Sequence, residues 1–278
     1  MSDQFPFGAS STRRISRLPK QAPAAVAVVG VYPSALHVRW DLPSWATESH
    51  GLPVRVGALA VDVEPTVFWD GVNPDPVPLV ADWQQRVGFV PGDEPGQHGH
   101  VRETMNGTSG RSVVDRVLGP LGVDSQRTMF TDLIPRFFVK SGTGGRAEQA
   151  DRIRDVYEPF AVLAGLPPAN LPARPTPRQL VSTVVSEERG RLRAELTATD
   201  AATVVSLGRE AQAALRQIVD GADGVPARGL RLEGYGQPGT LRVGEYRARW
   251  YALTHPGNRS AEWRRVHSDW EHAVRPVG

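Results

Sequence analysis

Three polar segments follow predicted buried strands and carry residues whose types suit ligand chemistry. They are residues 30–34 (Gly-Val-Tyr-Pro-Ser), residues 131–132 (Thr-Asp) and residues 255–258 (His-Pro-Gly-Asn). In open α/β sheets, ligands bind outside the carboxyl ends of the strands. Together these segments offer a carboxylate, an imidazole and exposed backbone amides. The sequence therefore predicts a ligand-binding crevice at one edge of a sheet.

The elements that must position these segments alternate between strands and helices. Residues 26–29 (Val-Ala-Val-Val) are apolar without alternation, which is typical of a strand buried on both faces. Gly30 permits a turn, and Pro33 cannot donate to a sheet ladder. Similar patterns predict strands at 127–133, 202–207 and 247–253, and helices at 112–121, 147–164, 176–197, 209–219 and near 263–273. This alternation predicts an α/β fold whose sheet is mainly parallel, with right-handed connections.

Residues 55–65 predict one more strand, and it carries two acidic residues. Asp62 and Glu64 are two positions apart, so they share one face of that strand. Two interpretations stay open: the pair marks an exposed edge, or one of the two is a site carboxylate. The preceding stretch, 35–56, is expected to be a long connection because prolines and glycine interrupt it.

Composition excludes several classes of protein. The chain has no cysteine, so disulfides, thiolate nucleophiles and cysteine-ligated metals are absent. No apolar run approaches the ~20 residues of a membrane span. The basic N-terminus lacks the apolar core of a secretory signal, so we expect a cytoplasmic protein that binds no membrane. Among the 32 basic residues only Lys20 and Lys140 are lysines, which reflects high-GC coding or contacts with phosphates.

The expected organisation is an arm followed by one domain. Residues 1–23 predict a basic, partly ordered arm, and residues 24–278 predict a single domain with insertions near 70–110 and 141–177. His98 and His100 lack a third ligand, so we predict no metal site. The glycine-rich residues 141–146 could cradle a phosphate, but they lack the ending of a nucleotide-binding P-loop.

The order of four short motifs resembles the uracil-DNA glycosylase superfamily. The motifs are a Gly-x-x-Pro turn (residues 30–33), a strand ending in Thr-Asp (131–132), a valine-rich strand followed by Leu-Gly and a helix (204–211), and a late His-Pro-Gly loop (255–257). The resemblance covers these four motifs and does not extend to the predicted insertions near 70–110 and 141–177. It implies a three-layer α/β/α sandwich with a mainly parallel central sheet, and DNA glycosylase activity without a cofactor.

The resemblance also implies roles for individual residues. A glycosylase flips a nucleotide into a pocket and hydrolyses its N-glycosidic bond, leaving an abasic site. This needs a carboxylate near the sugar and a hydrogen-bond donor at the base oxygen. The donor role falls to His255, and Arg259 lies where relatives insert an apolar wedge into the duplex. The implied base-binding residues are Gly30, Tyr32, Pro33, Thr131 and Asp132, and the implied DNA-binding residues are Ser34, Asn258, Arg259 and Ser260.

One departure from the family pattern concerns the catalytic carboxylate. Relatives often carry an acidic residue or Asn inside the Gly-x-x-Pro turn, where this chain has Val31 and Tyr32. The counterpart in the next segment is Asp62, with Glu64 in reserve and Asp41 behind both. If none of these carboxylates points into the pocket, the protein is a catalytically silent DNA-binding module of the same fold.

A second departure concerns the base. An ionised Asp132 can only accept hydrogen bonds, so it cannot donate to O4 of uracil but can accept from the amine of cytosine. Residues 58–61 (Ala-Leu-Ala-Val) are smaller than the Phe on which relatives stack the base. We therefore expect an enzyme that removes a cytosine-type or otherwise modified base, with room for a bulky one, in defence against phage DNA, or a damaged base in repair. We also expect it to be monomeric and monofunctional. The alternatives are that Thr131 reads the base and that the enzyme excises uracil or hypoxanthine conventionally.

Overall fold

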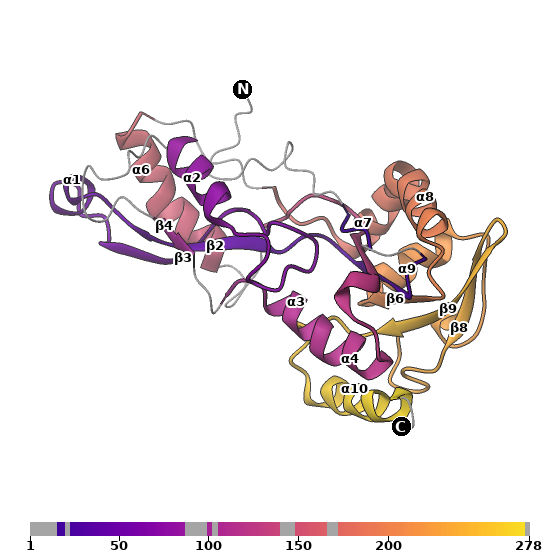
Figure 1. Ribbon diagram of the computed structural model, residues 1–278. Helices are drawn as coiled ribbons and strands as arrows, with labels where there is room; N and C mark the ends of the chain where they lie inside the picture. The colour runs from indigo at the N-terminus through magenta and orange to yellow at the C-terminus, as the bar shows by residue number, and fades with distance from the viewer. Residues whose placement is uncertain are drawn as a thin grey trace. The chain divides into compact units, whose positions relative to one another are not determined.

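The computed structural model describes residues 16–19, 23–86, 99–101, 105–139, 148–165 and 172–275 (Figure 1). The chain forms two compact units that alternate along the sequence. Among the described residues, the first unit takes Pro33–Thr108 and Arg136–Arg174, and the second takes residues up to Tyr32, Ser109–Pro135 and everything from Pro175 onward. The sequence predicted a single domain with two insertions. In the structure, nearly all of both insertions belong to the first unit, and residues 33–69 belong to it as well.

The second unit contains a six-stranded sheet with the order β5-β1-β6-β9-β8-β7. The first four strands in this order are parallel, and β8 and β7 are antiparallel additions at one edge. The bounds are β1 Val26–Gly30, β5 Thr128–Asp132, β6 Thr203–Leu207, β7 Gly221–Ala222, β8 Gly239–Val243 and β9 Tyr246–Leu253. The prediction of a mixed α/β protein with a mainly parallel sheet is therefore confirmed, whereas β7 and β8 were not predicted.

Strand β1 lies in the interior of this sheet. All five of its residues are buried, and it pairs with β5 on one side and β6 on the other. Because both edges and both faces are covered, an uninterrupted apolar run is the sequence that fits this position. In the register, Gly30 lies beside Asp132, and Leu207 lies beside Leu253. The predicted strand ends therefore do share one edge of the sheet.

Helices cover the sheet of the second unit on both faces. Figure 1 places α4 and α10 on one side and α8 and α9 on the other. Two of the helices are continuous runs that contain a π-helical turn. The bounds are α3 Thr108–Val113, η1 Val114–Leu118 and α4 Gly119–Leu121, then η2 Ser125–Arg127, then α7 Pro177–Thr183, η4 Val184–Glu188 and α8 Arg189–Thr199, then α9 Arg209–Ile218, η5 Pro226–Arg228 and α10 Ala261–Val274. This layering is compatible with the expected α/β/α sandwich.

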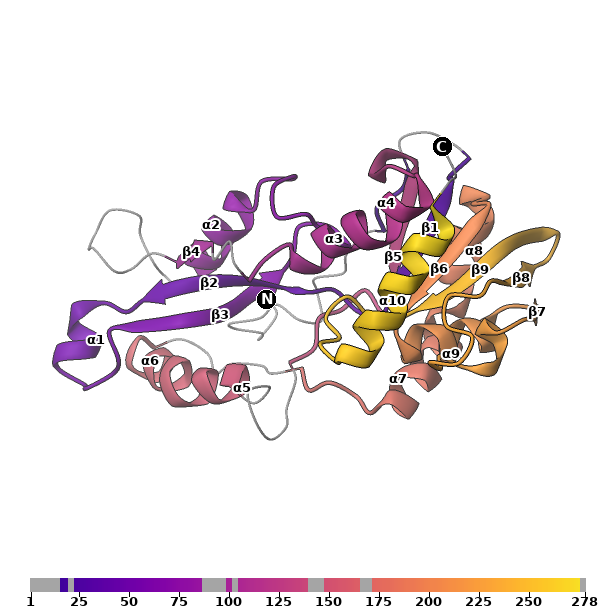
Figure 2. The same cartoon turned by 90° about the horizontal axis from the view of Figure 1, so that it is seen from below.

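The first unit has an antiparallel sheet of its own, with the order β3-β2-β4 (Figure 2). Its strands are β2 Ala35–Asp41, β3 Arg55–Val63 and β4 Gly99–Val101, and its helices are α1 Ser44–Glu48, α2 Val77–Arg86, α5 Glu148–Arg152, η3 Ile153–Tyr157 and α6 Glu158–Leu163. The expectation of a connection over residues 35–56 was wrong. Leu36, Val38 and Trp40 are buried and alternate with more exposed neighbours, which is the period of a strand with one buried face.

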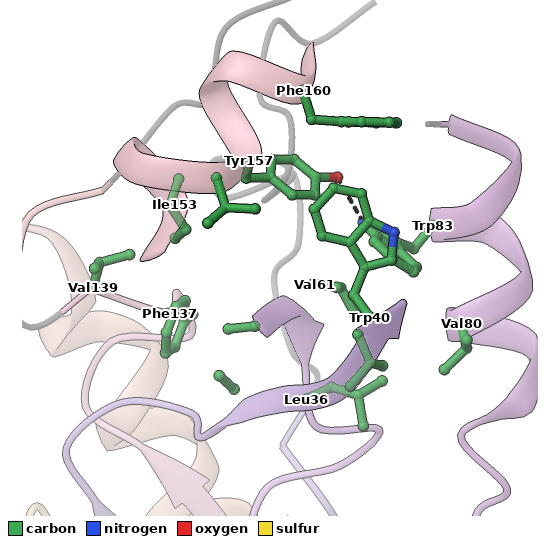
Figure 3. Packing of buried hydrophobic residues seen from close by; sticks show 14 of the residues in the cluster. Leu36, Trp40, Val61, Val80, Trp83, Phe137, Val139, Ile153, Tyr157 and Phe160 are labelled. Carbon is green, nitrogen blue, oxygen red and sulfur yellow. Dashed lines mark hydrogen bonds between the residues drawn. The ribbon is translucent and has the colours of Figure 1, made fainter. Parts of the chain in front are cut away.

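Aromatic side chains dominate the core of the first unit (Figure 3). Trp40 packs against Tyr157 and Phe160, with ring centroids 4.7 and 4.8 Å away. The indole N–H of Trp83 donates to the Tyr157 hydroxyl at 3.2 Å, which satisfies the one polar atom of that buried indole. The two predicted insertions and the β2–β3 segment before them therefore build one hydrophobic core together.

The described part of the N-terminal arm is residues 16–19. Arg17 forms an antiparallel bridge with Phe130 through two backbone hydrogen bonds of 2.9 and 2.8 Å. The arm therefore covers part of the outer edge of β5, which would otherwise present unpaired backbone groups. The rest of the predicted arm lies outside the described residues, apart from Pro23. None of the described helices combines the length and the apolar character that crossing a membrane requires.

Candidate functional site at the carboxyl edge of the parallel sheet

The carboxyl edge of the second unit's sheet contains a topological switch point. The chain leaves β1 for β5 on one side of it, whereas it leaves β6 for β9 on the other side. Ligands in open α/β sheets bind at such a point, where consecutive connections diverge. Beyond β5, the amides of Leu133 and Ile134 donate to the carbonyls of Gly30 and Val31, each at 3.1 Å. The Gly-x-x-Pro turn is therefore held against the segment that follows Asp132.

Gly208 is the point on which three segments converge. Its φ of +94° is in the range that glycine adopts without strain, and its amide donates to the Leu253 carbonyl at 2.8 Å. A Cβ placed on Gly208 would lie 3.7 Å from Cβ of His255. It would also lie 4.0 Å from Cγ2 of Val31 and 4.0 Å from Oε2 of Glu210. The structure therefore brings the end of β1, the first turn of α9 and the His255 loop together.

The ring of His255 is held in one tautomer. Its Nδ1 accepts the backbone N–H of Gly257 at 3.0 Å, and its side chain is exposed. A nitrogen that accepts a hydrogen bond carries no proton, so the neutral ring carries its proton on Nε2. In this tautomer the N–H donor of the His255 ring is therefore on Nε2.

A chain of hydrogen bonds behind the His255 loop fixes its backbone. The Thr254 amide donates to the Tyr235 hydroxyl at 3.0 Å, and that hydroxyl donates to Nδ1 of His267 at 2.6 Å. Nε2–H of His267 then donates to the carbonyl of Arg116 at 3.1 Å. Burial, and next the charge of Arg116, lower the pKa of His267, and burial raises the pKa of Tyr235. Both groups are therefore neutral near pH 7, as this chain of donors and acceptors requires.

Sequence reasoning missed Tyr235 and His267. His267 lies one residue after Val266 on the face of α10 that also carries the buried Trp270. The position of His267 next to the apolar residues of this helix face could have indicated a buried, hydrogen-bonded ring. Tyr235 had no such signal, because it lies in an irregular stretch between η5 and β8.

The cavity beside His255 is small. Its lining residues are Ser112, Arg116, Val117, Thr254, His255, Pro256, Asn258, Arg264 and His267. Its volume is about 10 Å³, which is room for one water molecule and not for a nucleobase. Tyr32 and Asp132 are not among the described residues that line it, so this cavity is not the base pocket that the sequence predicted.

The predicted DNA-binding residues after His255 form a turn. The Asn258 amide donates to the His255 carbonyl at 2.9 Å, and its side chain bonds to Thr254 at 2.9 Å and to the Ser260 amide at 3.1 Å. Asn258 thus has a clear role in shaping the loop. Arg259 and Ser260 are exposed. DNA contacts by these three residues stay a prediction.

Thr131 and Asp132 are both buried at the end of β5, with 0% and 5% of their surface exposed. The Thr131 hydroxyl donates to Glu195 at 2.7 Å and accepts from Arg191 at 3.1 Å. Arg191 also donates to the carbonyls of Asp132 and Leu133, at 2.8 and 3.0 Å. The hydroxyl of Thr131 is therefore engaged with α8. Base reading by Asp132 or by Thr131 stays a prediction.

Two ion pairs hold the Arg191 side chain in place at the end of β5. The guanidinium of Arg191 bonds to Glu188 at 2.7 Å and to Glu195 at 2.9 Å. Burial acts to lower the pKa of Arg191, but the two glutamates outweigh it and raise that pKa. Arg191 therefore stays charged and fixes the backbone that carries Asp132.

The carboxylates predicted to be catalytic belong to the first unit. Asp62 and Glu64 are 5% and 3% exposed, so the interpretation of an exposed edge is wrong for both. Asp62 accepts the Val63 amide at 2.7 Å, and Glu64 accepts the Gly107 amide at 2.6 Å. Asp41 is ion-paired with Arg55 near the other end of the β2–β3 ribbon. A catalytic role for Asp62 stays a prediction based on chain order.

Two further predicted site residues also begin the first unit. Pro33 is buried and Ser34 is half-buried, and the Ser34 carbonyl accepts the amide of Glu64 at 2.9 Å. Gly30, Tyr32, Thr131, Asp132 and the whole His255 loop belong to the second unit.

An open groove runs along α9 in the second unit. It has a volume of about 910 Å³ and is lined by Pro177, Arg178, Val181, Ser182, Val185, Ser186, Arg209, Glu210, Ala213 and Gln217. Its lining includes the apolar Val181, Val185 and Ala213 as well as the charged Arg178, Arg209 and Glu210. Glu210 is common to this groove and to the convergence at Gly208.

Comparisons with known proteins add no family. The sequence matches no protein-family model, and no curated protein matches it. Within the described residues, no three His, Asp or Glu side chains are grouped closely enough to hold a metal ion. His98 and residues 141–146 lie outside those residues, and the side chain of His100 is not described.

Proposed function

We propose that this protein is a DNA glycosylase that extrudes a modified or damaged base and hydrolyses its N-glycosidic bond. The observation that supports it best is the convergence at Gly208. There, the Gly-x-x-Pro turn and a histidine with a fixed N–H donor meet at the topological switch point of a parallel sheet. The order of the four motifs along the chain supports the same proposal.

The chemistry requires charge stabilisation on both sides of the breaking bond. As the C1′–N bond breaks, its electron pair moves onto the base and positive charge develops on the sugar. A donor already aimed at the base oxygen stabilises the departing anion, and Nε2–H of His255 fits this role. Water adds to C1′ and its proton ends on the base, so the products are a free base and an abasic site.

The proposed substrate is a modified cytosine. The carboxylate of Asp132 can accept from the exocyclic amine of cytosine, whereas it cannot donate to O4 of uracil. Its backbone is held by Arg191, which favours a fixed reading position. Conventional excision of uracil or hypoxanthine, and a silent DNA-binding module, are the competing functions.

The experiment compares base release from matched duplexes. Duplexes that contain uracil, hypoxanthine or a 5-substituted cytosine are incubated with the protein, and abasic sites are detected by alkaline cleavage. Free bases from genomes with modified cytosine are identified by mass spectrometry. We expect release of modified cytosine, and His255→Ala should lower the rate about 100-fold or more. His272→Ala, which changes an exposed histidine of α10, is the matched control.

Two outcomes would contradict the proposal in different ways. Strong uracil excision that is unchanged in Asp132→Ala would remove the assignment of the base. Duplex binding with no abasic product from any substrate would remove catalysis and leave the silent DNA-binding module.

A further inference from the structure

We propose that Glu210 supplies the catalytic carboxylate of this site, a role that chain order had given to Asp62. The inference rests on the proposed glycosylase function. It begins from the absence of an acid in the Gly-x-x-Pro turn, where Val31 and Tyr32 cannot take a proton from water. The reaction nevertheless needs a carboxylate near the sugar.

The geometry around Gly208 identifies the group. Oε2 of Glu210, Cβ of His255 and Cγ2 of Val31 all lie within 4.0 Å of the point where a Gly208 side chain would begin. The carboxylate of Glu210 is therefore directed back toward the strand ends and not away along α9. It reaches the neighbourhood of Val31, the turn residue that lacks an acid.

The position also suits an ionised, water-accessible carboxylate. Glu210 is in the first turn of the ten-residue helix α9, where the helix dipole stabilises negative charge. Its side chain is half-buried, so solvent can reach it. Gly208, the N-cap residue, has no side chain to fill the space beside the carboxylate.

The groove along α9 gives an extruded nucleotide room on the same side. Glu210 is one of the residues that line this groove of about 910 Å³. Ligand sites in proteins commonly have volumes of about 300–1,000 Å³, and a nucleotide with a bulky base is within that range. Glu210 therefore lines this groove and also lies beside Gly208, where Cβ of His255 approaches.

The proposed step balances as a hydrolysis. The oxygen of a water molecule forms a bond to C1′ while the C1′–N bond breaks and its electron pair leaves with the base. Glu210 accepts a proton from the attacking water, and His255 stabilises the base anion through its Nε2–H. The proton then passes from Glu210 through solvent to the base, which regenerates the carboxylate.

The test is the kinetics of the full-length Glu210→Gln variant on the duplex that the wild-type protein cleaves best. Glutamine keeps the size of the side chain but cannot accept the proton. We expect kcat to fall at least 100-fold, while the duplex dissociation constant changes less than threefold. Glu210→Asp should retain intermediate activity. Glu262→Gln, a change at an exposed acidic residue in the first turn of α10, is the matched control and should match the wild type.

The outcomes separate this inference from the proposed function. A kcat of Glu210→Gln within threefold of the wild type, with normal melting and duplex binding, would overturn the role of Glu210 and leave the glycosylase intact. Asp62→Asn, measured in parallel, tests the assignment by chain order. Absence of base release by the wild-type protein from every duplex would overturn both proposals.

Discussion

His255 and His267 are only twelve residues apart, but one ring is exposed and the other is buried. Both rings accept a hydrogen bond at Nδ1, from the Gly257 amide and the Tyr235 hydroxyl respectively. His255 is exposed, whereas His267 is buried and its Nε2–H donates to the Arg116 carbonyl. His267 therefore supports the loop that carries His255.

The buried histidine predicts that stability depends on pH. The pKa of His267 is lowered in the folded protein, so below its ordinary value of 6.5 the unfolded chain binds a proton that the folded protein does not. Its stabilisation is complete above about pH 6.5 and is lost as the pH falls toward the lowered pKa. Each unit of lowering is worth about 1.4 kcal/mol.

Urea denaturation at pH 7.5 and pH 5.5 measures this dependence. The free energy of unfolding should fall more between these two pH values in the wild type than in His267→Gln, which has no titrating ring. Equal falls in the two proteins would show that other groups cause the dependence.

At the residue scale, sequence reasoning placed polar residues at strand ends, as the structure shows, and missed contacts that form between distant segments. His255 and Asp132 follow apolar runs, and the register of parallel strands places such ends together. Glu210 and Tyr235 depend on how a helix start and an irregular segment pack against distant chain. No local pattern encodes those contacts.

At the scale of elements, helix α8 serves as an anchor for the end of β5. Arg191 joins Glu188 and Glu195 on its own helix to the carbonyls of Asp132 and Leu133. One guanidinium therefore satisfies several backbone and side-chain acceptors at the edge of the sheet. This arrangement is costly to break, because Glu188 is only 2% exposed.

Arg191→Met should destabilise the protein by about 3 kcal/mol, because it leaves a buried carboxylate and two carbonyls without their donor. Thermal or chemical unfolding measures the loss. Arg265→Met removes a pair whose two side chains are 69% and 66% exposed, and it should cost no more than about 1 kcal/mol. Similar losses in the two variants would contradict the anchoring role of Arg191.

The elements that the sequence predicted well are those with strong periodicity. Apolar runs and helical spacing located the parallel strands and the long helices. Strand β2 was missed because prolines and glycine follow it closely, and β8 was missed because its outward Thr240 and Arg242 dilute a short pattern. Antiparallel strands that are half exposed carry a weaker signal than buried parallel ones.

At the scale of the whole molecule, the chain holds two cores where one was expected. The aromatic core of the first unit draws Trp40, Trp83 and Phe160 from segments far apart in the sequence. Each of these segments alone is short and rich in polar or irregular residues. Their partnership depends on tertiary packing, so composition could not reveal it.

The proposed chemistry also predicts the response of the whole enzyme to metal removal. In the proposed mechanism His255 and a carboxylate carry the hydrolysis, so base release should be unchanged within about twofold in an excess of chelator. The assay is base release after dialysis against chelator, with and without added Mg²⁺ or Zn²⁺. Activity that is lost on dialysis and restored by either ion would contradict this mechanism.

The interleaving of the two units orders events during synthesis. Val26 of β1 pairs with Thr128 and with Thr203, so this apolar strand leaves the ribosome long before either neighbour exists. The first unit is complete at Arg174, before β6 and β9 have been translated. Because nascent chains fold from their N-terminal side, the inserted unit can acquire its core while the edge of β1 that pairs with β6 still has no neighbour. Chaperone demand should therefore be greatest for chains that stop between residues 174 and 203.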